Sequence, residues 1–178
     1  MEYIRLGRTG LTVSRLCVGT MNFGWQIDEQ QSHTILDRAI EGGLTFVDTA
    51  NMYGSETGDG LSERFIGSWF DKSGHRDNVV LATKVHGQMG VPVGAPAFTQ
   101  GDPNQRGNSR RWIVREVENS LRRLGTDWID LYQIHRPDPG TDHEETLGAL
   151  TDLQRQGKIR AFGSSTYPAE EKIGRAHV

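Results

Sequence analysis

The sequence has little cysteine: Cys17 is the single one among 178 residues. One cysteine excludes an intramolecular disulfide framework and a zinc site built from several cysteines. Cys17 lies in an apolar run between Leu16 and Val18, which favours a buried, unreactive thiol over a nucleophile. Residues with the spacing of metal ligands are also lacking, so no metal site is predicted.

Long apolar stretches and an excess of basic residues are lacking as well. No apolar run is long enough to span a bilayer, and the first five residues lack the apolar core of a signal peptide. The net charge of −3 and the pI of about 6.1 provide no basic field for nucleic acid or an anionic membrane. We therefore expect a cytoplasmic globular protein that binds neither nucleic acid nor membrane; its oligomeric state is left open.

Short apolar runs alternate along the chain with amphipathic segments of helical periodicity. Five runs have the character of buried parallel strands: 15–19, 44–48, 79–84, 128–135 and 159–164. Helices are predicted at about 29–41 and 61–71. Two more are expected from Ser109 to Gly125 and from a capping box of Thr141 and Glu144 to Gly157. This alternation predicts right-handed crossovers and a parallel sheet.

Two segments depart from the strand–helix alternation. Residues 86–109 are rich in glycine and proline and predict a long loop after the third strand. In a barrel such a loop overhangs the catalytic face, and a mobile surface insertion is the alternative. Before the first strand, residues 3–6 and 11–15 flank a turn with glycine at both ends. This pattern predicts a β-hairpin, which could close the bottom of a barrel.

Ionisable side chains end three successive predicted strands. Asp48 ends the second strand and is followed by Tyr53, Lys84 ends the third strand, and His135 ends the fourth. The carboxyl ends of parallel barrel strands meet at one mouth, so these four groups are expected to converge. Each alone has a structural explanation, such as a turn cap, a packed aromatic or a solvated charge. Together they favour a catalytic site.

The four groups suit hydride reduction of a carbonyl. Because tyrosine has an unperturbed pKa of about 10, Tyr53 would be protonated and able to donate a proton to the developing alkoxide. An ammonium beside a tyrosine stabilises its ionised form, which is the role expected of Lys84. Asp48 would hold Lys84 in place, and His135 could orient and polarise the carbonyl.

These residues lie in segments that resemble the aldo-keto reductase family, in particular bacterial members similar to the potassium-channel β-subunit branch. The matching motifs, in family order, are Leu6-Gly7-Arg8-Thr9-Gly10, Gly19-Thr20-Met21-Asn22-Phe23-Gly24, Phe46-Val47-Asp48-Thr49-Ala50-Asn51-Met52-Tyr53-Gly54, Ala82-Thr83-Lys84, Asp130-Leu131-Tyr132-Gln133-Ile134-His135 and Gly157-Lys158-Ile159-Arg160. The resemblance implies an α/β fold, the (β/α)8 TIM barrel, and NADP(H)-dependent reduction of aldehydes or ketones. It also implies that Asp48, Tyr53, Lys84 and His135 form the catalytic group.

The resemblance further implies contacts to NADPH or NADP+. Three residues match the family segment beside the nicotinamide: Gly19, Thr20 and Met21. Asp48 could reach the nicotinamide ribose. Ser165 matches a serine that binds the carboxamide, whereas Thr166 replaces the family's asparagine and keeps only one polar atom. Trp25 is similar to part of the wall around a small carbonyl substrate, which Tyr53 and His135 would complete.

Five of the family's eight strands can be recognised, which predicts an incomplete, C-terminally truncated barrel. Residues 1–171 are expected to form a hairpin and about five βα units. Residues 172–178 break the pattern and resemble a translated sequencing adapter, so a non-native tail is predicted. Two alternatives to a reductase stay open: a regulatory or binding protein on the same barrel, and a fragment that is inactive as given. The substrate and the choice between NADP and NAD are also left open.

Overall fold

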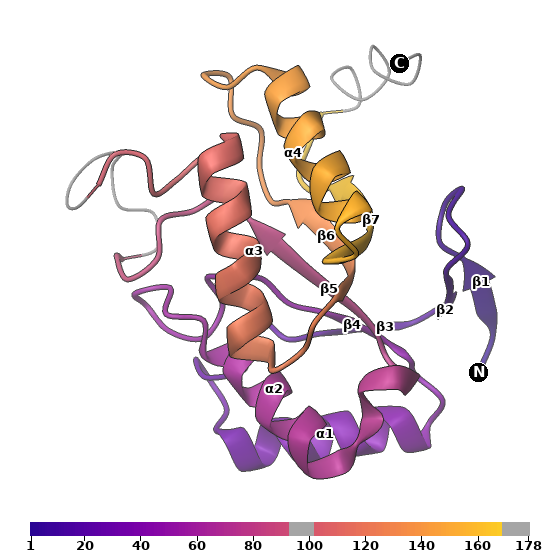
Figure 1. The fold of residues 1–178 in the computed structure, drawn as a ribbon. Helices are drawn as coiled ribbons and strands as arrows, with labels where there is room; N and C mark the ends of the chain where they lie inside the picture. Colours follow the sequence, from indigo (N-terminus) through magenta and orange to yellow (C-terminus); the bar gives the residue numbers. More distant parts are fainter. Residues whose placement is uncertain (93–101, 169–178) are drawn as a thin grey trace.

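The structure is a computed structural model that describes residues 1–92 and 102–168. An antiparallel hairpin of β1 (Tyr3–Arg5) and β2 (Thr12–Ser14) precedes a parallel sheet (Figure 1). The sheet strands are β3 (Cys17–Gly19), β4 (Phe46–Asp48), β5 (Val80–Val85), β6 (Ile129–Ile134) and β7 (Ile159–Ser164). They are hydrogen-bonded in chain order, and every pair is parallel.

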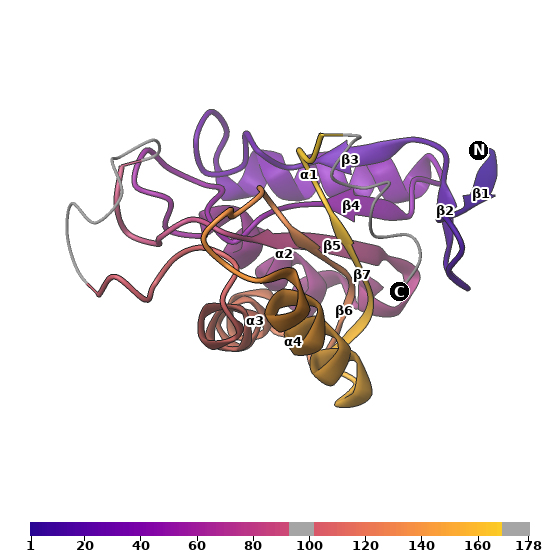
Figure 2. The ribbon, with the colours of Figure 1, turned by 90° about the horizontal axis from the view of Figure 1, so that it is seen from above.

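Helices connect the strands and lie along one side of the sheet (Figures 1 and 2). They are α1 (Glu29–Glu41), α2 (Leu61–Ser73), α3 (Arg110–Leu124) and α4 (His143–Arg155), with a short 3-10 helix, His75–Asn78, before β5. Strands in unbroken chain order with helices on one side are the arrangement of a (β/α)8 barrel rather than of a doubly wound sheet. The predicted fold class is confirmed, and the five strands correspond to the first five of that barrel.

Capping residues explain where the helices begin and end. The side chain of Ser109 accepts a hydrogen bond from Trp112 N at the start of α3, and Gly125 ends this helix with φ 62°, as predicted. The predicted capping box at the start of α4 is wrong. Asp142 is the N-cap, and its carboxylate accepts from Glu144 N, while the Thr141 hydroxyl donates to Asp138 Oδ2 at 2.7 Å. The nearby carboxylates are stronger acceptors than the Thr141 hydroxyl.

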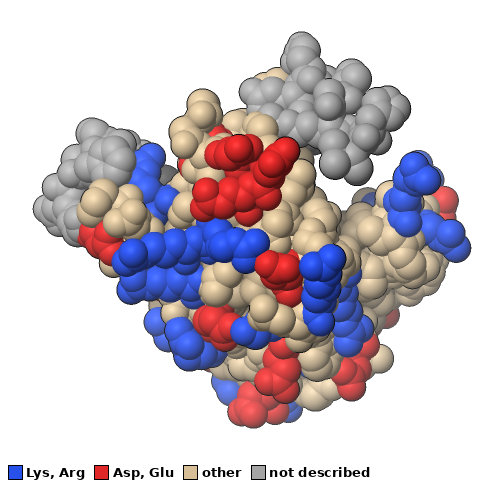
Figure 3. Space-filling model, turned by 45° about the horizontal axis from the view of Figure 1, so that its top comes forward, with Lys and Arg blue, Asp and Glu red and all other residues tan. Residues whose placement is uncertain are grey.

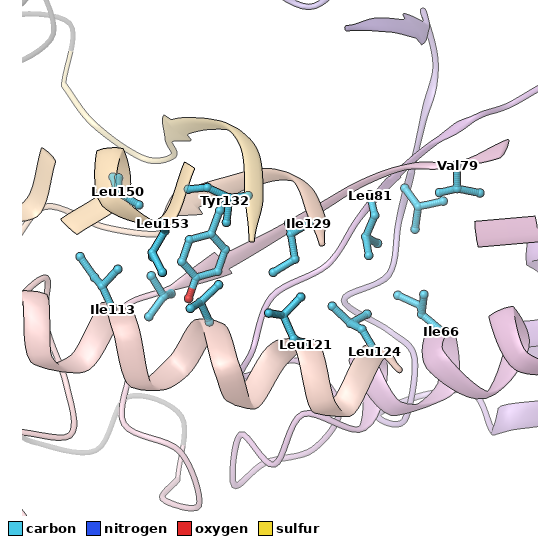
Figure 4. Packing of buried hydrophobic residues seen from close by; sticks show 14 of the residues in the cluster. Ile66, Val79, Leu81, Ile113, Leu121, Leu124, Ile129, Tyr132, Leu150 and Leu153 are labelled. Atoms are coloured by element: carbon cyan, nitrogen blue, oxygen red, sulfur yellow. The ribbon is translucent and has the colours of Figure 1, made fainter. Parts of the chain in front are cut away.

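The hydrophobic core lies between the sheet and the helices (Figure 4). The stripe of α3 predicted from the sequence is buried and faces β5 and β6. Its members are Ile113, Val117, Leu121 and Leu124. Burial of one such side chain contributes roughly 1.5–3 kcal/mol, so this layer holds the strands in register behind the site. Predicted strand and helix ends differ from the observed ones by one or two residues at several places.

Cys17 is exposed, so the prediction of a buried thiol is wrong. Successive side chains of a strand point to opposite faces of the sheet. Val18 packs against the core, whereas Cys17 and Gly19 point to the face opposite the helices. Because β3 is an edge strand among the described residues, this face is open to solvent at Cys17.

The predicted hairpin is confirmed, and it lies at the amino ends of the sheet strands. Ser14 Oγ accepts hydrogen bonds from Thr45 N at 3.1 Å and Phe46 N at 3.3 Å, where β4 begins. The loops that follow β4 and β5 lie at the other end of the sheet (Figure 2). The hairpin is therefore at the bottom of the predicted barrel, away from the mouth.

The outer surface carries charges of both signs. Basic and acidic side chains lie side by side on the face drawn in Figure 3, and Arg110 of α3 pairs with Asp152 of α4 at 2.8 Å. None of the helices within the described ranges is long and apolar enough to cross a membrane. The described parts of the predicted loop 86–109 contain neither helix nor strand, as expected. Its residues 93–101, the predicted domain end at residue 171 and the predicted tail 172–178 lie outside the described residues.

Candidate active site

The four predicted catalytic residues meet at the carboxyl ends of β4, β5 and β6. Lys84 Nζ forms an ion pair with Asp48 Oδ2 and donates to the carbonyl oxygen of Thr49 at 2.8 Å. The side chain of Lys84 is 6% exposed and that of Asp48 is 28% exposed. The pair is thus enclosed on the lysine side and open on the aspartate side.

Tyr53 and His135 complete this group. Lys84 Nζ lies 5.0 Å from the centre of the Tyr53 ring. The rings of Tyr53 and His135 are 5.8 Å apart between centroids and meet edge to face at 79°. Tyr53 is held from both sides, because its N–H donates to Ala50 O and its carbonyl accepts from Ser62 N, both at 3.1 Å. The structure therefore brings all four residues together.

Gln133 belongs to the same site, although sequence reasoning did not select it. Its Nε2 donates to Asp48 Oδ1 at 3.1 Å, so both oxygens of Asp48 have a partner. β5 and β6 pair with Lys84 opposite Gln133, which places the two side chains on one face of the sheet. A residue two positions before His135 faces the same mouth, and this alternation was the available signal.

The imidazole of His135 is neutral at neutral pH. Burial first, and then the positive charges of Lys84, Arg136 and His86, together lower the pKa of His135 from 6.5 to about 4. Its Nδ1 is buried and has no hydrogen-bond partner in the part of the chain that the structure describes. A neutral imidazole carries one N–H donor and one acceptor, so it can bind a polar ligand atom without adding charge.

A pocket of about 410 Å³ opens over Tyr53 and His135. Apolar side chains make up much of its wall, among them Met21, Trp25 and Met52. The three residues predicted to contact substrate, Trp25, Tyr53 and His135, all line it. Trp25 is 53% exposed and lies just after Gly24, whose φ of 81° turns the chain at this point. Such a mostly apolar cleft with a few polar groups is typical of a small-molecule site.

The segment expected beside the nicotinamide ends β3, next to Asp48. A Cβ added at Gly19 would meet no atom within 4 Å, so a flat ring has room there, and Met21 is 62% exposed. Thr20 differs, because its hydroxyl is buried. It donates to Asp48 O at 3.1 Å and accepts from Ser62 Oγ at 2.8 Å, and the whole residue is 0% exposed, so no part of Thr20 is open to a cofactor.

Ser165 and Thr166 follow β7 and present their hydroxyls near one another, with 3.3 Å between the oxygens. Ser165 N donates to Ile134 O at 2.8 Å, which ties this turn to β6. Thr166 has φ 58°, the one positive value at a non-glycine residue within the described ranges. A β-branched residue is strained in this conformation, whereas asparagine adopts it more readily. Thr166, which stands where the family motif has asparagine, is thus also a position of backbone strain.

Comparison with known proteins now identifies the family. The model of the aldo/keto reductase family matches residues 15–176, which include every sheet strand and all four catalytic candidates. The chain belongs to the aldo/keto reductase family. The resemblance inferred from the sequence motifs is confirmed.

Several relatives in this family are similar over nearly the whole chain. The chain is 47% identical over 168 residues to the uncharacterized oxidoreductase YrpG of Bacillus subtilis, covering 94% of the chain and 50% of the relative. It is 39% identical over 175 residues to the aldo-keto reductase YhdN of the same species, covering 96% and 49%. It is 37% identical over 185 residues to versiconal hemiacetal acetate reductase of Aspergillus parasiticus, covering 96% and 52%. The chain spans about half the length of the curated relatives it matches.

Proposed function

We propose that this member of the aldo/keto reductase family reduces aldehydes or ketones to alcohols with NADPH as hydride donor. The observation that carries the proposal is the grouping of Asp48, Tyr53, Lys84 and His135, of which Tyr53 and His135 line the pocket. Family membership supports the reaction class, and one relative with 37% identity is named a hemiacetal acetate reductase. We also propose a cytoplasmic setting, as expected from the sequence.

Tyr53 is the proposed acid. As a carbonyl accepts hydride, its oxygen becomes an alkoxide, and the Tyr53 hydroxyl donates the proton that neutralises it. The phenolate left behind lies near the Lys84 ammonium, which is 5.0 Å from the ring centre and favours the negative charge. Asp48 and the Thr49 carbonyl fix the direction of that ammonium.

His135 is proposed to orient the substrate. Because its pKa is lowered to about 4, the imidazole is neutral and can donate one N–H to the carbonyl oxygen without competing with Tyr53 as an acid. Its ring meets that of Tyr53 edge to face, so both groups can reach the same oxygen. The apolar wall of Met21, Trp25 and Met52 favours substrates with an aromatic or other apolar body.

The residues around β3 and β7 fit the nicotinamide end of NADPH. When bound, the nicotinamide supplies the hydride. The open space at Gly19 and the exposed Met21 side chain would lie against the ring, and the hydroxyls of Ser165 and Thr166 would bind its carboxamide. Asp48 is exposed enough on one side to reach the ribose.

Replacement of Tyr53 by phenylalanine tests the proposal. In the full-length product of the gene, Tyr53→Phe should lower kcat for 4-nitrobenzaldehyde by about 10²- to 10⁴-fold, followed as NADPH oxidation at 340 nm. The Kd for NADPH, measured by fluorescence, should stay near the wild-type value because the phenol is the only group removed.

Tyr3→Phe is the matched control, since Tyr3 lies in the hairpin at the opposite end of the sheet and its hydroxyl donates to Gly43 O. It should leave turnover unchanged. Wild-type turnover in Tyr53→Phe would show that the acid is assigned wrongly. NADPH binding without turnover of any aldehyde by the wild-type protein would instead favour a regulatory or binding role.

A further inference from the structure

A buried group of charged side chains lies between the helices and the sheet, behind the site. Arg123 of α3 donates from Nε to Glu63 Oε2 of α2 at 2.6 Å and from Nη2 to Glu116 Oε2 at 3.3 Å. The two carboxylate side chains are 0% and 1% exposed, and that of Arg123 is 10% exposed. These three residues are called the Arg123 cluster below.

Both carboxylates of the Arg123 cluster also bind a residue next to the catalytic group. Glu63 Oε1 accepts from the hydroxyl of Thr83 at 2.6 Å, and Thr83 directly precedes Lys84. Glu116 Oε2 accepts from Asn51 Nδ2 at 2.9 Å. The backbone N–H of Asn51 in turn donates to Lys84 O at 3.1 Å. The Arg123 guanidinium is thus linked to Lys84 by two routes. One runs through Glu63 to Thr83, the residue before Lys84, and the other runs through Glu116 and Asn51 to the carbonyl oxygen of Lys84.

Strand geometry explains why this link does not pass through the pocket. Thr83 and Lys84 are consecutive in β5, so their side chains point to opposite faces of the sheet. Thr83 pairs with Tyr132 of β6, whose ring lies in the core with its hydroxyl toward α3 (Figure 4). No member of the Arg123 cluster lines the pocket over Tyr53 and His135.

The chain between Asn51 and α2 packs tightly against Arg123. Gly60 precedes α2 with φ 77°, and a Cβ there would lie 2.7 Å from Arg123 Cδ and 2.9 Å from Asn51 O. A side chain could not fit without displacing either the guanidinium or the Asn51 peptide. The position of Arg123 therefore limits where the segment between Tyr53 and α2 can lie.

We propose that Arg123 is a positioning residue: it holds Thr83 and Asn51 through Glu63 and Glu116, and thereby sets the place of Lys84 relative to Tyr53. The inference rests on the proposed function, because it takes Lys84 and Tyr53 as catalytic. The planar fork of arginine can bind two carboxylates at fixed angles, which the single ammonium of lysine cannot reproduce.

Arg123→Lys in the full-length protein tests this role. The variant keeps the charge but loses the fork, so Lys84 should shift, and kcat for 4-nitrobenzaldehyde should fall by about 10- to 100-fold. KM should stay close to wild type, because the pocket wall is unchanged. Arg110→Lys is the matched control on the same helix, since Arg110 forms an exposed pair with Asp152. It should leave kcat and KM unchanged.

A second readout does not depend on turnover. With 3-fluorotyrosine placed at position 53, the 19F chemical shift should change in Arg123→Lys and not in Arg110→Lys. If the wild-type protein shows no reductase activity, the proposed function fails, while the 19F shift still reports whether Arg123 controls the surroundings of Tyr53. A lower melting temperature with unchanged kcat and unchanged 19F shift would show a purely structural role and overturn the inference.

Single-path variants keep the inference testable if Arg123→Lys does not fold. Thr83→Val removes the hydroxyl that Glu63 binds, and Glu116→Gln weakens the bond to Asn51; each should lower kcat more than KM. If both variants fold, Arg123→Lys and Thr83→Val should lower kcat together by less than the product of their separate effects. Wild-type kcat in Thr83→Val and in Glu116→Gln would overturn the proposal.

Discussion

Two ion-pair groups lie back to back across β5, and they differ in how completely they are enclosed. In the Arg123 cluster, every carboxylate oxygen of Glu63 and Glu116 has a hydrogen-bond donor, and both side chains are buried. The pair of Lys84 and Asp48 is open on one side, with the side chain of Asp48 28% exposed. Beside that pair, His135 Nδ1 is buried without a partner in the described part of the chain.

The difference shows that a buried ion pair can serve either the stability of the fold or the chemistry of a site. Where every oxygen has a protein partner and is also buried, no ligand can reach it, and the cluster acts on the surrounding backbone. Where one carboxylate of an ion pair is partly exposed, as that of Asp48 is, a ligand can reach it. Burial of the basic side chain alone would not have distinguished the two, because Lys84 is as buried as Arg123.

The largest expected effect is on stability and falls on the enclosed group. Glu63→Ala leaves Arg123 with one carboxylate in place of two and Thr83 without its acceptor, so we expect the free energy of unfolding to fall by about 3–5 kcal/mol. Lys84→Met should cost less than about 2 kcal/mol, because Asp48 keeps its bond from Gln133 and can be hydrated.

Urea unfolding of both variants measures this contrast. For activity we expect the opposite order of the two variants, since Lys84→Met should abolish most turnover in the full-length protein. Equal losses of stability would break the comparison, because they would mean that the open pair holds the fold as strongly as the enclosed one.

A smaller effect concerns the pH dependence of stability. The pKa of His135 is lowered from 6.5 to about 4, first by burial and then by the charges of Lys84, Arg136 and His86. Between these values the unfolded chain binds a proton that the folded chain does not. Stability from this group is therefore complete above about pH 6.5 and is lost as pH falls toward 4, by roughly 1–3 kcal/mol.

Urea unfolding at pH 4.5, 5.5 and 7.5 checks this, with His135→Gln as the reference that has no titrating ring. The wild-type chain should lose more stability than His135→Gln as pH falls, since carboxylates contribute equally to both. If the free energies of unfolding of the two proteins fell equally with pH, His135 would not be shielded from solvent. The site around it would then hold more water than the mostly apolar pocket wall indicates.

The smallest effect is expected at the rim of the site. Thr166 has φ 58°, so Thr166→Asn should stabilise the chain by about 1 kcal/mol through relief of backbone strain. Its amide should also tighten NADPH binding in the full-length protein. Thr166→Gly relieves the same strain without offering an amide, so it should raise the melting temperature but not the affinity. No stabilisation by either variant would argue against strain at this position.

Much of the fold was predictable because it follows local rules. Apolar runs of strand length, helical stripes and the caps at Ser109 and Gly125 depend on residues near one another in the chain. The two errors differ in kind, because the first depends on competing residues nearby in the chain and the second on the arrangement of the strands. Asp142 displaced Thr141 as the cap of α4 because Asp138 holds the Thr141 hydroxyl, and Cys17 is exposed because β3 is an edge of the described sheet.

The site was predictable only in part, for a similar reason. Asp48, Lys84 and His135 were found because parallel strand ends converge, and Tyr53 because it follows one of them. Gln133 was not selected, since its role depends on the register that sets it opposite Lys84. The buried hydroxyl of Thr20 was also not foreseeable, because its partner Ser62 comes from α2.

The sequence by itself determined the family, the order of strands and helices, and the four side chains that meet at the mouth. These follow from motifs and periodicity along the chain. Only the tertiary structure decided which charged groups are enclosed and which are open. Arg123 lies 60 residues from Glu63, and Asn51 lies 65 residues from Glu116, so nothing local links these partners. Whether a charge is satisfied or left for a ligand depends on what packs against it, and packing is decided by the whole fold.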